Sequence, residues 1–352
     1  MKAVIAREDV GRLLAIAARR DELHVPVLDG GGGRFVPLNA EDPVPRDGLM
    51  LNGSSARRPP KEVLFAQTAP LFAFELRRGD FSIDELPPEA ATKVLFGVRP
   101  CDGRGFRVLD SLLLGKCGTD PAYASARQGS VLVGIGCGRP GSDCFCTSVG
   151  GDPHGTDGLD VLATDLGDAL HLESLTDGGE GWLRAIAAAV DSPLTPANPE
   201  TDQRCREAHE EARGRVPRHV DLEPLDAVLE RAFDDELWDD LAAACIGCGA
   251  CTFLCPTCRC FDVQDEVRGD RGLRVRVWDS CMFREYTQEA GGHNPRPRRG
   301  MRWRNRFYDK FRWGAHDGQP ACVGCGRCIT HCPSGVDLID LVERVVESGG
   351  AA

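Results

Sequence analysis

Residues 245–256 read CIGCGACTFLCP, and residues 322–333 repeat this pattern as CVGCGRCITHCP. Each copy has the spacing C-x2-C-x2-C-x3-C and ends in proline. Three thiolates at this spacing hold one iron–sulfur cluster, while the fourth is a ligand of the other cluster in a two-cluster ferredoxin. The repeated pattern therefore decides the fold of the second half of the chain. It predicts an α+β, ferredoxin-like unit that holds two [4Fe–4S] clusters.

The exchange of the fourth ligand assigns four iron-binding cysteines to each cluster. Cluster I takes Cys245, Cys248, Cys251 and Cys332, and cluster II takes Cys322, Cys325, Cys328 and Cys255. With four thiolates each, neither cluster keeps an open iron, which favours electron transfer over substrate chemistry, and no catalytic residue is expected. Zinc is the alternative, but structural zinc sites close on four local ligands, usually from paired C-x2-C units. Two complete runs of this pattern favour iron.

A long insertion separates the two copies, since Cys255 and Cys322 lie 67 positions apart. It contains Cys258, Cys260 and Cys281, within the segments PTCRC and LRVRVWDSCMF, and predicts a strand or hairpin beside the clusters. These three thiols form an extra metal site or a redox-active group on one interpretation. On the other, which we favour, they are small buried side chains, because free cysteine packs as a small hydrophobe.

A second group of cysteines lies in the first half of the chain, which reads as an α/β unit. The short apolar runs at 94–98, 131–135 and 159–164 are typical of strands buried on both faces. Such folds place their ligands at neighbouring strand ends. We therefore expect a third [4Fe–4S] cluster, with buried structural thiols or a zinc site as alternatives. Its candidate ligands are Cys101, Cys137, Cys144 and Cys146, with Asp102 as a substitute.

The glycines of this region do not predict a nucleotide site. Gly136, Gly138 and Gly141 match the dinucleotide-binding pattern formally. Pro140 and the following SDCFC do not open a helix, however, and a helix N-terminus is what a pyrophosphate group requires.

The distribution of proline, charge and apolar residues divides the chain into two domains. An α/β domain is expected over 1–230 and the two-cluster domain over 231–352. Residues 191–220 are rich in proline and charge and predict a linker. Apolar residues at helical spacing predict one amphipathic helix over 225–241 and a packing helix over 336–346.

Composition narrows the class of protein. The 352 residues carry a net charge of −12, and residues 1–230 hold 25 basic against 36 acidic side chains, so a domain-scale nucleic-acid binder is not expected. The total of 17 cysteines is odd and argues against a disulfide framework. The sequence shows neither a secretory signal nor an apolar run near ~18 residues, which predicts a cytoplasmic protein without a membrane span.

One basic segment runs against the acidic trend. Residues 296–312 contain eight arginine and lysine side chains interleaved with aromatic residues, a pattern that single-strand nucleic-acid binders also use. We favour a different interpretation, in which these cations lie near the anionic clusters and at interfaces.

Several segments together resemble one family. They are GVRPCD (97–102), GCGRPGSDCFCTSVGG (136–151), CIGCGACTFLCPTCRCFDVQDE (245–266), WDSCMF (278–283) and AGGHNPRPRR (290–299). This set resembles the beta subunit of cytosolic NiFe hydrogenases of the sulfhydrogenase type, and it is similar to the electron-transfer subunit of anaerobic sulfite reductase. The resemblance spans the chain from about residue 60 to its end, and the segment that begins at 290 is closer to the hydrogenase version.

The resemblance implies a non-catalytic electron-transfer subunit of a hetero-oligomeric oxidoreductase. A flavin-containing partner would handle NAD(P)H, and NiFe hydrogenase small and large subunits would hold the catalytic metal. In the sulfite reductase alternative, the catalytic partner carries sirohaem. A third possibility is a self-contained iron–sulfur reductase, in which an open iron in the N-terminal cluster would bind substrate.

Overall fold

The first half of the chain folds around an eight-stranded sheet with the strand order β10-β1-β9-β8-β7-β6-β2-β3. The computed structural model describes residues 1–39, 41, 48–51, 53, 55–86, 92–115, 118–314 and 318–349. Strands β2, β6, β7 and β8 pair in parallel, and the outer strands pair antiparallel. The strands are β1 Lys2–Ala6, β2 Glu22–Val27, β3 Arg34–Leu38, β6 Lys93–Val98, β7 Val131–Ile135, β8 Val161–Asp165, β9 Ala169–Ser174 and β10 Thr195–Pro196.

Helices cover both faces of this sheet, which confirms the α/β expectation. On β6, Val94 and Phe96 pack into one apolar core, and Leu95 packs into the core on the opposite face. The first core includes side chains of α1 and α5, and the second includes side chains of α2, α3 and α4. These helices are α1 Val10–Ala18, α2 Lys61–Leu64, α3 Pro100–Leu113, α4 Pro121–Arg127 and α5 Asp177–Ala187. The apolar runs predicted as strands are β6, β7 and β8.

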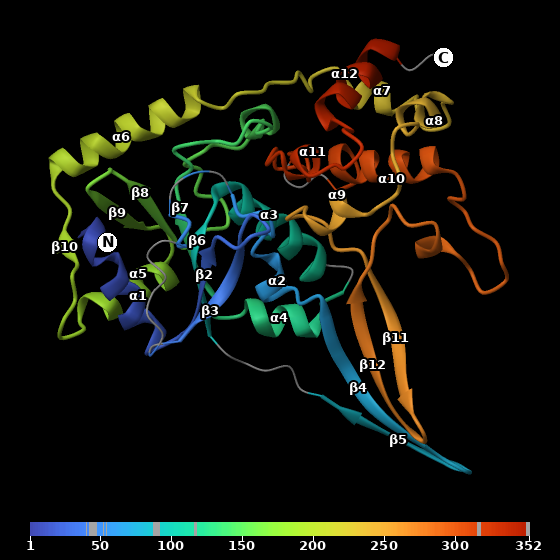
Figure 1. Ribbon diagram of the computed structural model, residues 1–352, viewed down its shortest axis with the longest axis horizontal. Coiled ribbons are helices and arrows are strands. Elements are labelled where there is room, and N and C mark those ends of the chain that lie inside the picture. The colour runs from blue at the N-terminus through green and yellow to red at the C-terminus, as the bar shows by residue number, and fades with distance from the viewer. Residues whose placement is uncertain are drawn as a thin grey trace.

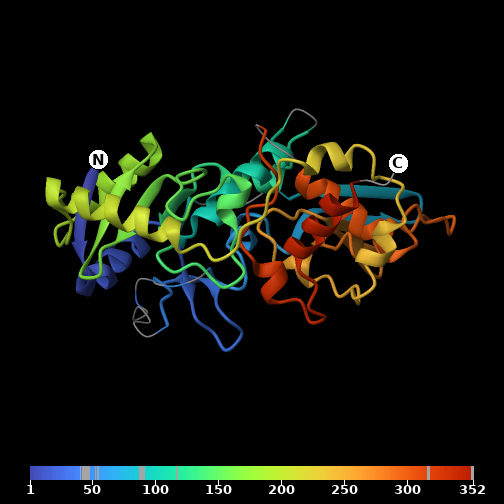
Figure 2. The same ribbon diagram turned by 90° about the horizontal axis from the view of Figure 1, so that it is seen from above.

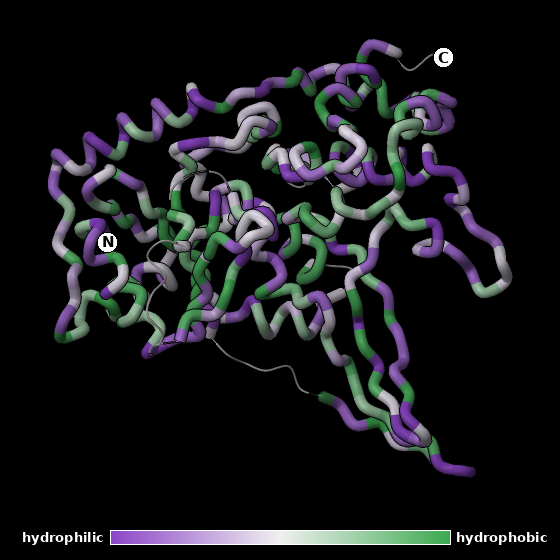
Figure 3. Tube along the Cα trace, viewed as in Figure 1, coloured by the Kyte–Doolittle hydropathy of each residue, from purple (hydrophilic) through white to green (hydrophobic). Residues whose placement is uncertain are grey.

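Residues 191–220 are not only a linker, because they contain α6, Pro199–Gly214. This helix runs along the outside of the sheet toward the second unit (Figures 1 and 2), and Figure 3 shows that most of its residues are hydrophilic. Within it only Cys205 and Ala212 are buried. Asn198 and Thr201 form a capping box that satisfies the amides of the first turn, so the helix starts without an apolar stripe.

Short helices and loops around the repeated motifs form the second unit. Its helices are α7 Leu225–Leu229, α8 Leu237–Leu241, α9 Ala250–Phe253, α10 Arg299–Phe311, α11 Arg327–Thr330 and α12 Leu338–Ser348. Short 3-10 helices occur in both units of the described chain: η1 Arg7–Asp9, η2 Cys146–Val149 and η3 Glu285–Thr287. The single helix expected over 225–241 is therefore wrong, since a turn separates α7 from α8. Trp238 closes that turn by donating its indole N–H to the carbonyl of Ala232. The packing helix expected over 336–346 is α12.

A four-stranded antiparallel sheet projects as an arm below the two units (Figure 1). Its order is β11-β12-β4-β5, with β4 Thr68–Arg77, β5 Asp80–Glu85, β11 Phe261–Arg268 and β12 Arg271–Trp278. The hairpin predicted in the insertion is β11–β12, and it pairs with a hairpin from the first half of the chain. The domain boundary near residue 230 stays a prediction. The four-stranded sheet contains strands from both sides of that boundary. None of the helices in the described ranges is long and apolar enough to cross a membrane.

Candidate iron–sulfur sites

The four cysteines predicted for cluster I line one cavity in the second unit. Cys245, Cys248, Cys251 and Cys332 line it together with Met282, Trp303 and Cys328, which was predicted for cluster II. Cys245 and Cys248 come from the loop that leads into α9, Cys251 lies in α9, and Cys332 comes from the segment that follows α11. The two short helices α9 and α11 contact each other, so the repeat along the chain is also a repeat in space.

Glycines with positive φ angles shape this site. Gly249 starts α9 at φ +75°, and Gly326 starts α11 at φ +72°, a left-handed conformation that suits glycine best. Backbone amides point at the sulfur atoms as a result: the Gly247 amide donates to Cys245 Sγ at 3.3 Å. Burial acts to raise the pKa of Cys332, but hydrogen bonds from Ser334 and nearby amides hold that pKa below its usual value. Such donors stabilise thiolates, the form that binds iron.

The four cysteines predicted for cluster II form a second, more buried group. Burial raises the pKa of Cys322 to about 12, against a hydrogen bond from the Gly324 amide, and the nearby Cys255 and Cys325 raise it further. Burial also raises the pKa of Cys328, and Cys322, Cys325 and Cys255 all act on it. These mutual effects indicate that the four thiols lie near one another. Thiols so crowded and buried are costly to ionise unless a cation compensates them.

Three buried cations supply this compensation around Cys255. Arg306 donates to Cys258 Sγ at 3.4 Å and to the Cys251 carbonyl at 3.0 Å. Lys310 donates to the Thr257 hydroxyl at 2.8 Å, and Lys61 donates to the Cys258 carbonyl at 2.9 Å. Arg306 and Lys310 belong to the basic segment that was expected near the clusters.

The chemistry of this environment fits a negatively charged cluster. The Cys258 thiol lowers the pKa of Cys255 by donating a hydrogen bond to it, and the Lys310 and Arg306 charges lower it further, although burial opposes both effects. Buried cations persist only where negative charge balances them. Sequence spacing finds Cys255 but does not find Lys61, which lies almost 200 positions away in α2.

The four cysteines of the predicted third cluster come together beside the second motif. Cys101 lies in the first turn of α3, and Cys137 follows β7. Cys144 lies in the loop before η2, and Cys146 is the first residue of η2. Burial first, and then the neighbouring thiols of Cys325, Cys137 and Cys146, raise the pKa of Cys144 to about 12. The strand ends therefore bring the two N-terminal loops to one place, next to a ligand predicted for cluster II.

The contact between this loop and the second motif is close. The Cys144 thiol donates to the Cys325 carbonyl at 3.7 Å, and the Phe145 amide donates to the Gly324 carbonyl at 2.8 Å. A Cβ atom on Gly324 would lie 2.6 Å from the Cα of Cys146, a distance that real Cβ atoms essentially never show. Glycine at 324 is thus required by the docking of the N-terminal loop.

Asp102, the substitute ligand expected from the sequence, pairs with a buried cation in this structure. Arg327 donates to both of its carboxylate oxygens, at 2.7 and 2.8 Å, and both side chains are buried. Arg327 also donates to the Ala56 carbonyl at 2.8 Å. The carboxylate therefore clamps the second motif onto the first unit, and Arg327 lies between two predicted ligands of cluster II.

The three cysteines of the insertion lie near cluster II. Cys258 and Cys281 are buried, and Cys260 is partly buried. A hydrogen bond from Cys281 lowers the pKa of Cys260 against the effect of burial. Within the described ranges, no three Cys, His, Asp or Glu side chains meet the geometry of a site for a single metal ion.

Comparisons with known proteins bear on these sites directly. A model described as a 4Fe-4S dicluster domain matches residues 244–336, which implies two [4Fe–4S] clusters in that region. The chain is 33% identical over 331 residues to Sulfhydrogenase 2 subunit beta of Pyrococcus furiosus, covering 92% of this chain and 91% of that protein. The chain belongs to the sulfhydrogenase beta-subunit family. No solved structure matches the chain. The family resemblance drawn from the cysteine segments is confirmed, and membership makes this an iron–sulfur subunit.

Proposed function

We propose that this chain relays electrons between a flavin-containing subunit that uses NAD(P)H and a catalytic metal subunit, most directly that of a cytosolic NiFe hydrogenase. One observation supports the proposal most: Cys332 lines one cavity with the cysteines of the first motif, and Cys255 lies among the buried thiols of the second motif. Four ligands to each cluster leave no iron free for substrate, and closed clusters exchange electrons. When bound, the clusters would supply the one-electron carriers of the relay.

The proposed ligands follow the pairing predicted from spacing. Cys332 completes the cavity of the first motif, and Cys255 completes the group of the second motif. Amides at Gly247 and Val336 donate to the sulfurs of cluster I ligands at 3.3 and 3.2 Å. Around cluster II, Arg306 and Lys310 hold positive charge against the thiolates. Hydrogen bonds and positive charge both favour the reduced state of a cluster, so these residues would tune the potentials.

The third thiol group, Cys101, Cys137, Cys144 and Cys146, would extend the relay beyond cluster II, on the side away from cluster I. Its loop touches Cys325 and Gly324, so the three proposed sites follow one another in the order third group, cluster II, cluster I. At the far end, Cys248 is exposed and Ile246 is 63% exposed, which supports docking of a partner there.

The arm supports a second contact with a partner subunit. Leu76 pairs with Phe81 and Phe74 pairs with Ile83 across β4 and β5, and directly paired residues share one face of a sheet. Phe81 is 70% exposed and Val267, on the same face, is 59% exposed. An exposed apolar face of this kind marks an interaction site.

A ligand variant tests the proposal in the complex. Cys248→Ala removes one proposed ligand of cluster I, so NAD(P)H-driven hydrogen turnover should be lost while NAD(P)H oxidation by an artificial acceptor continues. Cys205→Ala is the matched control, because this buried thiol lies on α6, away from the three groups, and coupled turnover should persist. Normal coupled turnover in the Cys248 variant would refute the relay.

The partners themselves separate the proposal from its alternatives. Anaerobic purification from the native cell, followed by mass spectrometry, should find a flavin subunit together with NiFe subunits. A sirohaem subunit would assign the chain to a sulfite reductase instead. A brown chain without partners would favour a self-contained reductase.

A further inference from the structure

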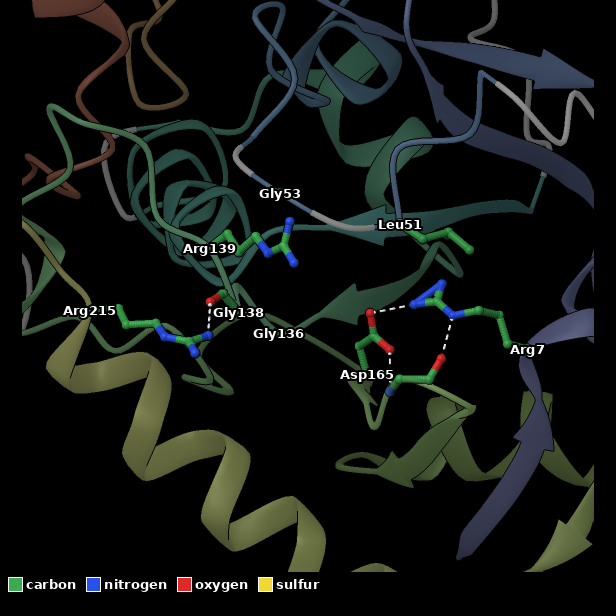
Figure 4. A pocket seen from close by; sticks show the side chains of 9 residues that line it. Arg7, Leu51, Gly53, Gly136, Gly138, Arg139, Asp165 and Arg215 are labelled. Carbon is green, nitrogen blue, oxygen red and sulfur yellow. Dashed lines mark hydrogen bonds and ion pairs between the residues drawn. The ribbon is translucent and has the colours of Figure 1, made fainter.

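An open cleft of about 500 Å³ lies at the carboxyl ends of β7 and β8 (Figure 4). Gly136 directly follows β7, Asp165 ends β8, and both line the cleft. Open α/β sheets bind their ligands at the carboxyl ends of parallel strands. No predicted cluster ligand lines the cleft, yet Cys137 lies between Gly136 and Gly138, two residues of its wall.

Three arginines from separate elements reach this cleft, and Figure 4 shows their side chains around it. Arg7, from η1, donates to Asp165 at 2.6 Å and to the Gly167 carbonyl at 2.7 Å, so its charge is neutralised within the wall. Arg215, which caps α6, donates to the Gly138 carbonyl at 3.1 Å and pairs with Glu211 outside the cleft. Among the described residues that line the cleft, one carboxylate faces three guanidinium groups, so this lining carries a net positive charge.

The guanidinium N–H groups of Arg139 can donate hydrogen bonds to a ligand in the cleft. Among the residues that the structure describes, no hydrogen bond or ion pair engages its guanidinium group. Five N–H donors in a planar fork suit an oxyanion such as a phosphate or carboxylate, which accepts two parallel hydrogen bonds. An anion in the cleft would supply what this side chain lacks.

The floor of the cleft is held in place by buried groups. Arg99 is buried and donates to the carbonyls of Gly136, at 3.1 Å, and Leu51, at 3.3 Å. The ring of buried His154 packs against Gly136, where an added Cβ would lie 2.1 Å from it. Nothing lies within 4 Å of where a Cβ of Gly138 would stand, so the backbone faces open space there. A fixed floor and a bare backbone allow a ligand to approach closely.

We propose that this cleft binds a small anionic molecule, with its phosphate or carboxylate group held by Arg139 and Arg215 against the backbone of the Cys137 loop. The site goes beyond the electron relay and does not depend on it. It also gives Gly136 and Gly138 a role in the wall of the site. No α-helix follows these glycines, so guanidinium groups take the place of a helix N-terminus at the anion. The volume exceeds that of a bare phosphate ion and suits a small metabolite.

Calorimetric titration of the anaerobically purified complex tests the proposal with three probes: pyrophosphate, citrate and AMP. At least one should bind with one site per chain, and Arg139→Gln should weaken that binding at least tenfold, as expected for the loss of charge-assisted hydrogen bonds. Tighter binding of AMP and pyrophosphate than of citrate would identify a phosphate group, and the reverse order would identify a carboxylate.

Arg213→Gln is the matched control. Arg213 lies on the same helix as Arg215, its side chain is 71% exposed, and it does not line the cleft, so binding should stay within twofold of the unaltered protein. Absence of binding by all three probes would overturn the proposal. Equal binding to the unaltered protein and the Arg139 variant would overturn it as well.

Discussion

Removing the carboxylate of Asp102 should destabilise the protein strongly, because Arg327 would be left buried without its counter-ion. Both side chains are almost fully inaccessible, and the pair makes two hydrogen bonds of 2.7 and 2.8 Å. Breaking such a buried pair costs about 3–5 kcal/mol. The Ala56 carbonyl, which accepts from the guanidinium Nε, is too weak a partner to replace a full negative charge.

The effect of Asp102→Ala should appear as a lower melting temperature. For cooperative units of this size, each kcal/mol corresponds to roughly 2–4 °C, so the expected decrease is about 6–20 °C. Anaerobic thermal unfolding, followed by circular dichroism and by visible absorption, measures it. The control is Asp157→Ala, which breaks the exposed pair between Asp157 and Arg107 and should cost under about 1 kcal/mol.

A double variant separates the loss of the Asp102–Arg327 attraction from the cost of leaving Arg327 buried without a counter-ion. Arg327→Met in the Asp102→Ala background removes the uncompensated cation and fills its space with an apolar chain of similar length. The double variant should therefore melt well above the Asp102 single variant. If Asp102→Ala melts within about 2 °C of the unaltered protein, the clamp between the two units contributes little, and the reasoning fails.

Three further predictions concern the sites and their surroundings. Gly324→Ala should detach the loop of Cys146 and lower the iron content by about one third. Gly335→Ala, which has the same left-handed backbone but open space around the added Cβ, should keep its iron. Equal iron content in the two variants would contradict the packing argument. Cys332→Ser should remove about 4 irons per chain and leave the electron paramagnetic resonance signal of one ferredoxin cluster; loss of both signals would contradict the proposed ligand sets. Burial, with smaller effects from stacked His209 and from Arg99, lowers the pKa of His154 from 6.5 to about 3, so the folded state binds fewer protons than the unfolded state at acidic pH. The free energy of unfolding should therefore fall by about 2 kcal/mol from pH 7 to pH 5, and His154→Gln should remove that part of the decrease in thermal melts at the two pH values.

The strands that carry the third thiol group could be predicted because burial on both faces leaves a continuous apolar signature. The runs at 94–98 and 131–135 are β6 and β7, the central parallel strands. The cysteines that follow them were expected at neighbouring strand ends, and the structure places their loops together. Local sequence was sufficient here, because the packing requirement is the same along the whole strand.

Other elements left no such signature. Helix α6 is polar on nearly all sides, and only its capping box at Asn198 marks its start. The arm joins β4 to β12, about 200 residues apart, and its strands are too exposed for a one-sided apolar pattern to reveal their pairing. The break between α7 and α8 depends on the hydrogen bond from the Trp238 indole to the Ala232 carbonyl, and the spacing of apolar residues does not predict that bond.

The candidate sites divide in the same way. Spacing alone proposes the eight thiols of the two motifs, since iron–sulfur chemistry constrains the distance between ligands along the chain. The third thiol group was proposed from the neighbouring strand ends instead. Some charges around those thiols come from distant segments: Lys61 in α2 reaches the Cys258 carbonyl, and Arg327 in α11 reaches Asp102 beside Cys101. Asp102 was expected as a substitute ligand of the third cluster, and in the structure it pairs with Arg327, 225 positions away. Pairing over such distances is a property of the folded chain.

Reduction of this chain's clusters from both ends tests the electron relay most directly. The anaerobic complex is exposed either to NAD(P)H or to hydrogen, and the visible absorption of the iron–sulfur centres is followed in the unaltered protein and in Cys248→Ala. We predict that each reductant bleaches the same bands in the unaltered protein, and that the variant loses the cluster I contribution and the transfer between the two ends. Bleaching by only one reductant in the unaltered complex would contradict a relay that connects both partners.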